Sequence, residues 1–98
     1  MKIIDIINKG IPSLSFEVFP PKTESSYESV SEATNEIAKL HPSFMSVTYG
    51  AGGGTSAYTL EIANNIKKIY GVPSLAHLTC VSSTKQTVKQ RIEDIKRA

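Results

Sequence analysis

Three side chains that can exchange protons or donate hydrogen bonds occupy corresponding places in this sequence. Glu17, Thr48 and His77 each lie near the end of a short apolar run, and a helical pattern follows each run. If the runs are parallel strands, these side chains share the carboxyl end of one sheet, where α/β folds bind their ligands. We therefore take this end of the sheet as the candidate site.

Glu17 carries the strongest chemical signal of the three. It stands between Phe16 and Val18 inside a strand, an unfavourable place for an ionised group. Burial disfavours the charged form of a carboxyl, so this setting predicts a protonated side chain that can act as a general acid. The competing interpretation is a carboxylate satisfied by a backbone donor or a basic partner, and the residue types favour neither.

Thr48 and His77 give weaker signals. Thr48 precedes the glycine-rich residues 50–54 and could donate to a ligand, although Thr is also common in strands for its branched side chain. The glycine segment has neither the dinucleotide-binding nor the Walker pattern, so it predicts close backbone approach to a ligand or a flexible loop. A lone histidine such as His77 is more often a core residue than a ligand. Since no second His or Cys stands at a metal-site spacing, no metal site is predicted.

The elements that position these residues alternate regularly. The apolar pattern predicts a short helix over residues 3–7, ended by Gly10, and then strands over 14–19, from 44 to 48 or 49, and from 74 to 78 or 79. Longer helices are predicted from about Ser25 to the exit at Pro42, over 55–70, and after Ser83.

Capping boxes and apolar stripes support the three long helices. Ser25 with Glu28, and Ser83 with Gln86, match the capping-box pattern. The residues expected to face the core are Val30, Ala33, Ile37 and Leu40 in the first helix, Ile62, Ala63, Ile66, Ile69 and Tyr70 in the second, and Val88, Ile92 and Ile95 in the third.

Two architectures fit this plan of three βα units. One is a minimal open sheet of three parallel strands, and the other is the first part of a (β/α)8 TIM barrel, which needs ~250 residues. The strand faces favour the barrel, because one face gathers polar residues and the other is apolar. The polar face carries Ser15, Glu17, Ser46, Thr48, Leu75, His77 and Thr79, and the apolar face Phe16, Val18, Met45, Val47, Ala76 and Leu78. We expect an α/β fold made of the first three βα units of such a barrel, preceded by the short N-terminal helix.

Composition narrows the functional classes. The net charge of +2 over 98 residues is too small to indicate nucleic acid or a membrane surface. No apolar stretch approaches ~20 residues, and the N-terminus has no secretory pattern. The single cysteine, Cys80, is expected to pack as a small residue and excludes a disulfide within the chain. These features predict a cytoplasmic protein.

Together, residues 15–21, 46–53 and 76–80 resemble methylenetetrahydrofolate reductases in order and separation. The resemblance implies a barrel that binds FAD, takes electrons from NAD(P)H and reduces 5,10-methylenetetrahydrofolate to 5-methyltetrahydrofolate for methionine synthesis. It implies that Glu17 is the general acid that helps to open the imidazolidine ring of the folate. It also implies that Thr48, Tyr49, Ala51 and His77 line the flavin, which their hydrogen bonds can tune.

The sequence departs from the family in what it lacks. The Arg-Gly-Asp segment and the further FAD and folate contacts of the later strands are not among these 98 residues, and roughly five of eight barrel strands are missing. We therefore expect residues 1–98 to be the incomplete N-terminal portion of a single reductase barrel domain, inactive alone. An open sheet edge also predicts a homo-oligomer or other association.

Two alternatives to this reading stay open. One is a non-enzymatic βα fragment that self-associates or serves as a binding module, as the short chain suggests. The other is a related flavin-dependent barrel dehydrogenase acting on an amino acid. The paired Pro20 and Pro21, together with residues 48–50, favour the reductase over this dehydrogenase.

Overall fold

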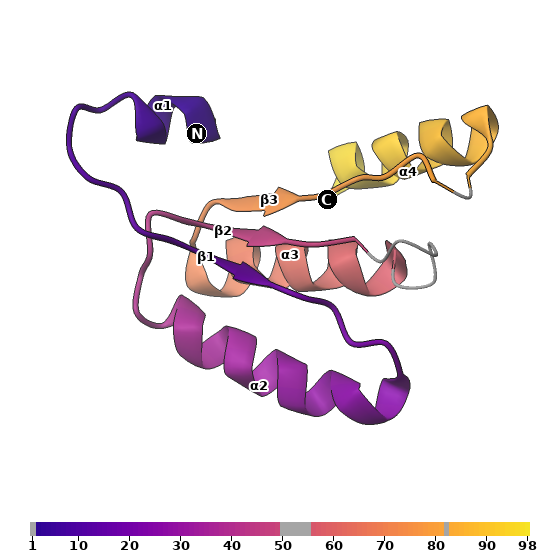
Figure 1. The fold of residues 1–98 in the computed structure, drawn as a ribbon, viewed down its shortest axis with the longest axis horizontal. Helices are drawn as coiled ribbons and strands as arrows, with labels where there is room; N and C mark the ends of the chain where they lie inside the picture. Colours follow the sequence, from indigo (N-terminus) through magenta and orange to yellow (C-terminus); the bar gives the residue numbers. More distant parts are fainter. Residues whose placement is uncertain (1, 50–55, 82) are drawn as a thin grey trace.

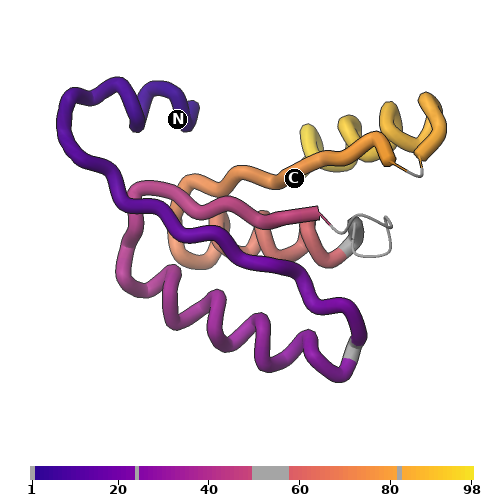
Figure 2. Tube along the Cα trace, in the orientation of Figure 1, coloured from indigo at the N-terminus to yellow at the C-terminus, as the bar shows by residue number. Residues whose placement is uncertain are grey.

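Three parallel strands lie at the centre of the molecule (Figure 1). They are β1 (Ser15–Val18), β2 (Phe44–Val47) and β3 (Ser74–Ala76), in the order β1-β2-β3. This computed structural model describes residues 2–49, 56–81 and 83–98. Each strand pairs with the next one along the chain, as successive βα units do when their crossovers are short. Figure 2 shows the chain returning through a helix between the strands.

The helices surround this sheet unequally. They are α1 (Ile3–Ile7), the 3₁₀ turn η1 (Glu24–Ser26), α2 (Tyr27–Ala38), α3 (Ser56–Tyr70) and α4 (Lys85–Arg97). Helices α2 and α3 cover one face, α1 lies near the amino ends of the strands, and α4 extends beyond the carboxyl end of β3 (Figure 1). The order of elements confirms the predicted α/β architecture of three βα units behind a short helix, the pattern of a (β/α)8 barrel portion.

The core lies between the sheet and helices α2 and α3. The strand residues Met45 and Val47 are fully buried, and Ile66 of α3 is 1% exposed. Removing an apolar side chain of this size from water stabilises the fold by roughly 1.5–3 kcal/mol. The same cluster contains Val18, Ala38, Ile62, Ala63 and Val72. Burial of this face confirms that the apolar strand residues point toward the helices.

Two helix stripes differ from the prediction. Helix α2 ends at Ala38, so Leu40 lies beyond it and is 70% exposed. Thr34 is buried in α2 instead, because its hydroxyl donates to the carbonyl of Val30 at 2.8 Å and so satisfies its polar atom inside the helix. In α3 the predicted Ile69 is 66% exposed.

Helix α4 buries none of its residues. Its predicted stripe is present, but Ile92 is 40% exposed and Ile95 is 37% exposed. Ala33, expected in the stripe of α2, is also exposed. The spacing of apolar residues shows which face of a helix is apolar, whereas the burial of that face depends on what packs against it.

Both predicted capping boxes are wrong in detail. The turn η1 occupies Glu24–Ser26, and Ser26, the N-cap of α2, makes no side-chain cap hydrogen bond. At α4 the box is shifted by one residue. The Thr84 hydroxyl oxygen accepts from the Thr87 N–H at 3.1 Å, and the Thr87 hydroxyl oxygen accepts from the Thr84 N–H at 3.0 Å. Each donor is thereby satisfied reciprocally.

The strands are shorter than predicted at several of their ends. Leu14 and Phe19 flank β1 and are 62% and 67% exposed. The hydrogen-bonded ladder nevertheless continues one residue past the assigned strands, because Thr48 N–H donates to the Val18 carbonyl and His77 N–H to the Val47 carbonyl, each at 3.0 Å. Thr48 and His77 are therefore held in strand-like positions.

Two further sequence expectations can be placed. Cys80, expected to pack, is exposed, because it follows β3 on the loop that leads to α4 rather than entering the core. Across the ranges that the structure describes, no helix is both long and apolar enough to cross a membrane. The glycine-rich segment 50–54 lies outside the described residues.

Candidate functional site

The strand register sets the candidate site on the sheet face that α2 and α3 leave open. Glu17 stands opposite Ser46, and Ser46 stands opposite Leu75, so these three form one row across the sheet. Side chains of residues in register point to the same face, and residues two positions on return to it. Thr48 and His77 thus occupy this face one step closer to the carboxyl end.

Glu17, Ser46 and His77 meet on this face. The Ser46 hydroxyl donates to Glu17 Oε1 at 3.0 Å, and His77 Nε2 lies 3.3 Å from the same oxygen. Adjacent strands are about 4.8 Å apart, so the long glutamate side chain reaches from β1 across β2 toward β3. The structure therefore brings together two of the predicted site residues, Glu17 and His77, through a third that the prediction did not single out.

The expectation that Glu17 is buried is wrong. Its side chain is 47% exposed, because Phe16 and Val18 point to the helix-covered face and Glu17 points to the other. Alternation along a strand separates neighbours in sequence onto opposite faces. The competing interpretation, a carboxylate satisfied by partners, describes the observed contacts with Ser46 and His77.

Ser46 is the site residue that sequence reasoning missed. It was assigned to the polar face of its strand, but a serine in a strand has no chemical signal of its own. The signal that could have found it is the strand register. In a parallel pair, a polar residue opposite Glu17 on β2 lies within hydrogen-bond reach of the Glu17 side chain. Using this signal needs the exact register, which the alternation along a strand leaves open to shifts of two residues.

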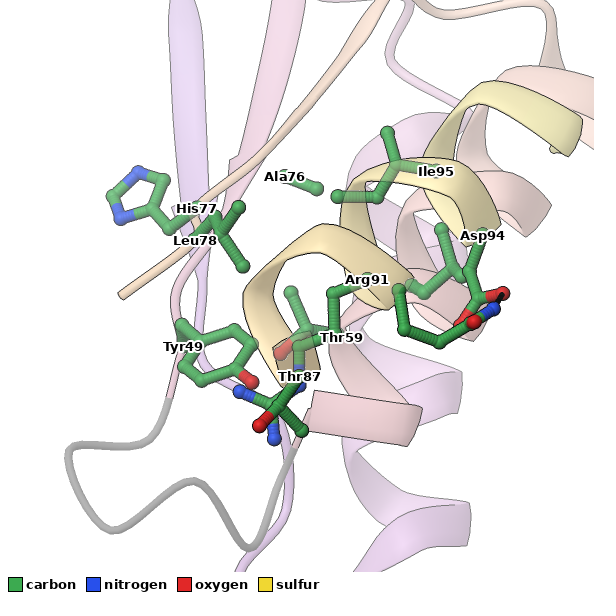
Figure 3. Close-up of a pocket in the computed structure, with 11 residues that line it drawn as sticks. Tyr49, Thr59, Ala76, His77, Leu78, Thr87, Arg91, Asp94 and Ile95 are labelled. Carbon is green, nitrogen blue, oxygen red and sulfur yellow. Dashed lines mark hydrogen bonds between the residues drawn. The ribbon is translucent and has the colours of Figure 1, made fainter. Parts of the chain in front are cut away.

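Tyr49 lies apart from this cluster. A cleft of about 290 Å³ separates α4 from α3 and β3, and Tyr49 and Thr59 line it together with Arg91. Figure 3 shows Tyr49 among these residues and the imidazole of His77 pointing away from them. The Arg91 guanidinium lies 5.4 Å from the centre of the Tyr49 ring, and the buried Tyr49 hydroxyl has no hydrogen-bond partner among the described residues.

The backbone at the end of β2 is anchored to α3. The Thr59 hydroxyl, on a residue only 2% exposed, donates to the carbonyl of Thr48 at 2.9 Å. With the Thr48 N–H bound to Val18, both main-chain groups of Thr48 are satisfied. The backbone position of Thr48 is thus fixed from both sides. Ala51 lies outside the described residues.

The arrangement can hold a carboxyl oxygen in one place and expose hydrogen-bonding groups beside it. Among the residues that the structure describes, no cluster of three or more His, Cys, Asp or Glu could hold a metal ion. A parallel βα sheet with acid–base groups at its carboxyl end is the arrangement of the βα-barrel class of enzymes, whose sites lie at that end.

Comparison with known proteins identifies the family. The model of the methylenetetrahydrofolate reductase family matches residues 2–98, so the chain belongs to that family, as the three strand-end motifs predicted. Methylenetetrahydrofolate reductase (NADH) 1 of Zea mays is 39% identical over 97% of this chain and 16% of its own length.

Bacterial reductases are similarly related to this chain, which again covers only part of their length. The 5,10-methylenetetrahydrofolate reductase of Buchnera aphidicola is 37% identical over 88% of this chain, and that of Escherichia coli is 34% identical over 88%. The chain spans 32% and 29% of these two proteins, so it corresponds to less than a third of each.

Proposed function

We propose that residues 1–98 form the N-terminal portion of a single barrel domain that reduces 5,10-methylenetetrahydrofolate to 5-methyltetrahydrofolate. Family membership supports the reaction, and the contact of Glu17 Oε1 with Ser46 and His77 supports the site. NAD(P)H is the proposed electron donor, and the name of the maize relative specifies NADH for that protein. The segment alone is proposed to be inactive, because the resemblance to the family implies that the rest of the folate and flavin site lies on later strands.

Glu17 is the proposed general acid. Its carboxyl group gives a proton to one nitrogen of the imidazolidine ring while the bond from that nitrogen to the methylene carbon breaks. The electron pair of the broken bond stays on the protonated nitrogen, and the methylene carbon becomes an iminium with the other ring nitrogen. That carbon then accepts a hydride and becomes the methyl group. The position of Glu17 at the carboxyl end of β1 supports this role.

The residues present fit one edge of a flavin. Thr48 and His77 offer a hydroxyl and an imidazole on the Glu17 face, and such groups hydrogen-bond the carbonyls and nitrogens of a flavin ring. FAD, when bound, supplies hydride transfer from NAD(P)H to the folate. Tyr49 and Ala51 complete the proposed set. Tyr49 contributes through its main chain, because its ring packs against Arg91 on the other side of the sheet.

The proposed setting is the cytoplasm, where the single thiol would stay reduced. In the part of the chain that is described, β1 and β3 are each paired on one side only. Unpaired strand edges associate readily. We propose that these edges take up the later strands of the barrel in a complete chain, or a second copy when the segment is alone.

The deciding experiment replaces Glu17 by Gln in a complete reductase chain that carries this segment. We expect folate reduction to fall by roughly a hundred-fold or more, while flavin reduction by NAD(P)H continues, because a general acid contributes about 10²–10⁴ in rate. Glu36→Gln on α2, whose carboxylate pairs with the exposed Lys39, is the matched control. Unchanged folate turnover in Glu17→Gln would refute the role of Glu17. Turnover of proline instead of folate by the unmodified complete chain would favour the dehydrogenase alternative.

A further inference from the structure

Ser46 is the most rigidly placed of the three residues, Glu17, Ser46 and His77, that meet on the open face of the sheet. It lies on the central strand β2, which is paired on both sides, and its neighbours Met45 and Val47 are fully buried. A core packed at this density leaves the backbone between those two residues little freedom. Ser46 also has a single side-chain torsion to its hydroxyl oxygen, whereas Glu17 has three to its carboxyl group.

The row in which Ser46 stands determines the direction of its hydrogen bond. On one side its register partner is Glu17, and on the other it is Leu75, which offers no acceptor on its side chain. The hydroxyl donates to Glu17 Oε1 at 3.0 Å. A serine hydroxyl can donate at any pH, whereas His77 Nε2, at 3.3 Å from the same oxygen, donates only when it carries a hydrogen.

Both contacts converge on Oε1, and Oε2 takes part in neither. An oxygen that accepts from Ser46 and faces an imidazole is poorly placed to carry the acidic proton. We propose that Ser46 is a positioning residue, which holds Glu17 Oε1 as an acceptor and so leaves Oε2 to carry the proton to the substrate. The catalytic part of this proposal rests on the proposed function of Glu17, whereas the orienting part rests on the geometry alone.

The orienting part can be tested on the 98-residue chain itself. Three-bond scalar couplings measured by NMR report whether the χ1 angle of Glu17 stays in one rotamer. We expect one rotamer in the unmodified chain and in Ser46→Thr, which keeps the hydroxyl, and averaged couplings in Ser46→Ala. Ser15→Ala, on the same face one row away, is the control that should leave Glu17 unchanged. A single rotamer in a folded Ser46→Ala chain would overturn the proposal.

The catalytic part is tested with the same variants in a complete reductase chain. We expect Ser46→Ala to lower kcat for folate reduction about ten-fold, a smaller loss than that of Glu17→Gln. The KM for folate should stay unchanged, and so should the rate at which NAD(P)H reduces the flavin. Ser46→Thr should restore most of the rate, which a purely structural role of the small side chain would not predict. If Glu17 couplings are averaged in Ser46→Ala but kcat is unchanged, the positioning role in catalysis is refuted. If Glu17→Gln also leaves kcat unchanged, it is the proposed function that fails.

Discussion

His77 Nε2 lies 3.3 Å from Oε1 of Glu17, although the central strand β2 separates the strands that carry the two residues. Ser46 donates to the same oxygen from that central strand. One carboxyl oxygen thereby links all three strands on the face that the helices leave open. A contact of this kind couples the geometry of the site to the integrity of the sheet.

The Glu17–His77 contact should matter for ligand binding more than for stability. Both side chains are more than 40% exposed, so solvent screening limits the pair to less than about 1 kcal/mol. We therefore expect His77→Ala to change the free energy of unfolding of this chain, measured by urea titration, by less than about 1 kcal/mol. In a complete chain the same change should weaken FAD binding about ten-fold, measured by flavin fluorescence.

His41→Asn provides the control for His77→Ala. His41 is exposed with a φ of 53°, a conformation that Asn tolerates, so its replacement should affect neither quantity. Equal FAD affinity in His77→Ala and unmodified protein would remove His77 from the proposed flavin site.

Met45 should be the most sensitive position of the core. It belongs to the central strand and its side chain is fully buried on the face that α2 and α3 cover. Truncating a side chain of this size leaves a cavity that costs about 2–5 kcal/mol. Small domains have only about 5–15 kcal/mol of stability, so Met45→Ala should lower the urea midpoint sharply or unfold the chain. Leu40→Ala, at a position 70% exposed, should shift the midpoint little, and equal shifts for the two would contradict the assigned core.

The Tyr27–Glu61 hydrogen bond should give stability that disappears at high pH. The Tyr27 hydroxyl donates to Glu61 Oε1 at 2.5 Å and so ties α2 to α3. This hydrogen bond, with a smaller effect of burial, raises the pKa of Tyr27 from 10.0 to about 12. Because the raised pKa favours the protonated phenol in the folded state, the contribution is complete below pH 10 and is lost as the pH rises to about 12.

Tyr27→Phe measures that contribution. We expect it to lower the free energy of unfolding by about 1 kcal/mol or less at pH 8, since the pair is exposed, and to cost progressively less toward pH 12. Differences between the two proteins, from urea titrations at each pH, cancel the titration of the other groups. A Tyr27→Phe effect that is the same at both ends of this range would show that Tyr27 ionisation is not linked to folding.

Arg91 should anchor α4, which buries no residue of its own. Its guanidinium donates to the Ser83 hydroxyl at 2.8 Å and lies over the Tyr49 ring. A cation–π contact at such a site contributes about 0.5–1 kcal/mol. We expect Arg91→Gln to speed amide hydrogen exchange in α4 several-fold, while Arg97→Gln, in the exposed last turn, does not. No difference between the two variants would mean that α4 is held by other contacts.

Much of the architecture was predictable because hydrophobic periodicity is a local property. The second long helix was predicted over residues 55–70 and is observed as Ser56–Tyr70, and Gly71 takes the left-handed conformation, φ 66°, that ends it. The alternation in the strands likewise assigned Val18, Met45 and Val47 correctly to the helix-covered face.

The site itself was predictable only in outline. The repeated order of strand and helix predicted parallel strands, and therefore that Glu17 and His77 would share one end of the sheet, as they do. The three motifs around them also predicted the family. These inferences succeeded because they depend on the order of residue types along the chain.

Only the tertiary structure decided which atoms meet and which faces are covered. Periodicity placed Glu17 and Ile69 on particular sides of their elements, but both are exposed, since exposure depends on what packs there. The partnership of Glu17 with Ser46 depends on the register of β1 against β2. A shift of two residues would keep Ser46 on the same face but separate it from Glu17, and the alternation of the strands, which specifies only the face, does not exclude that shift.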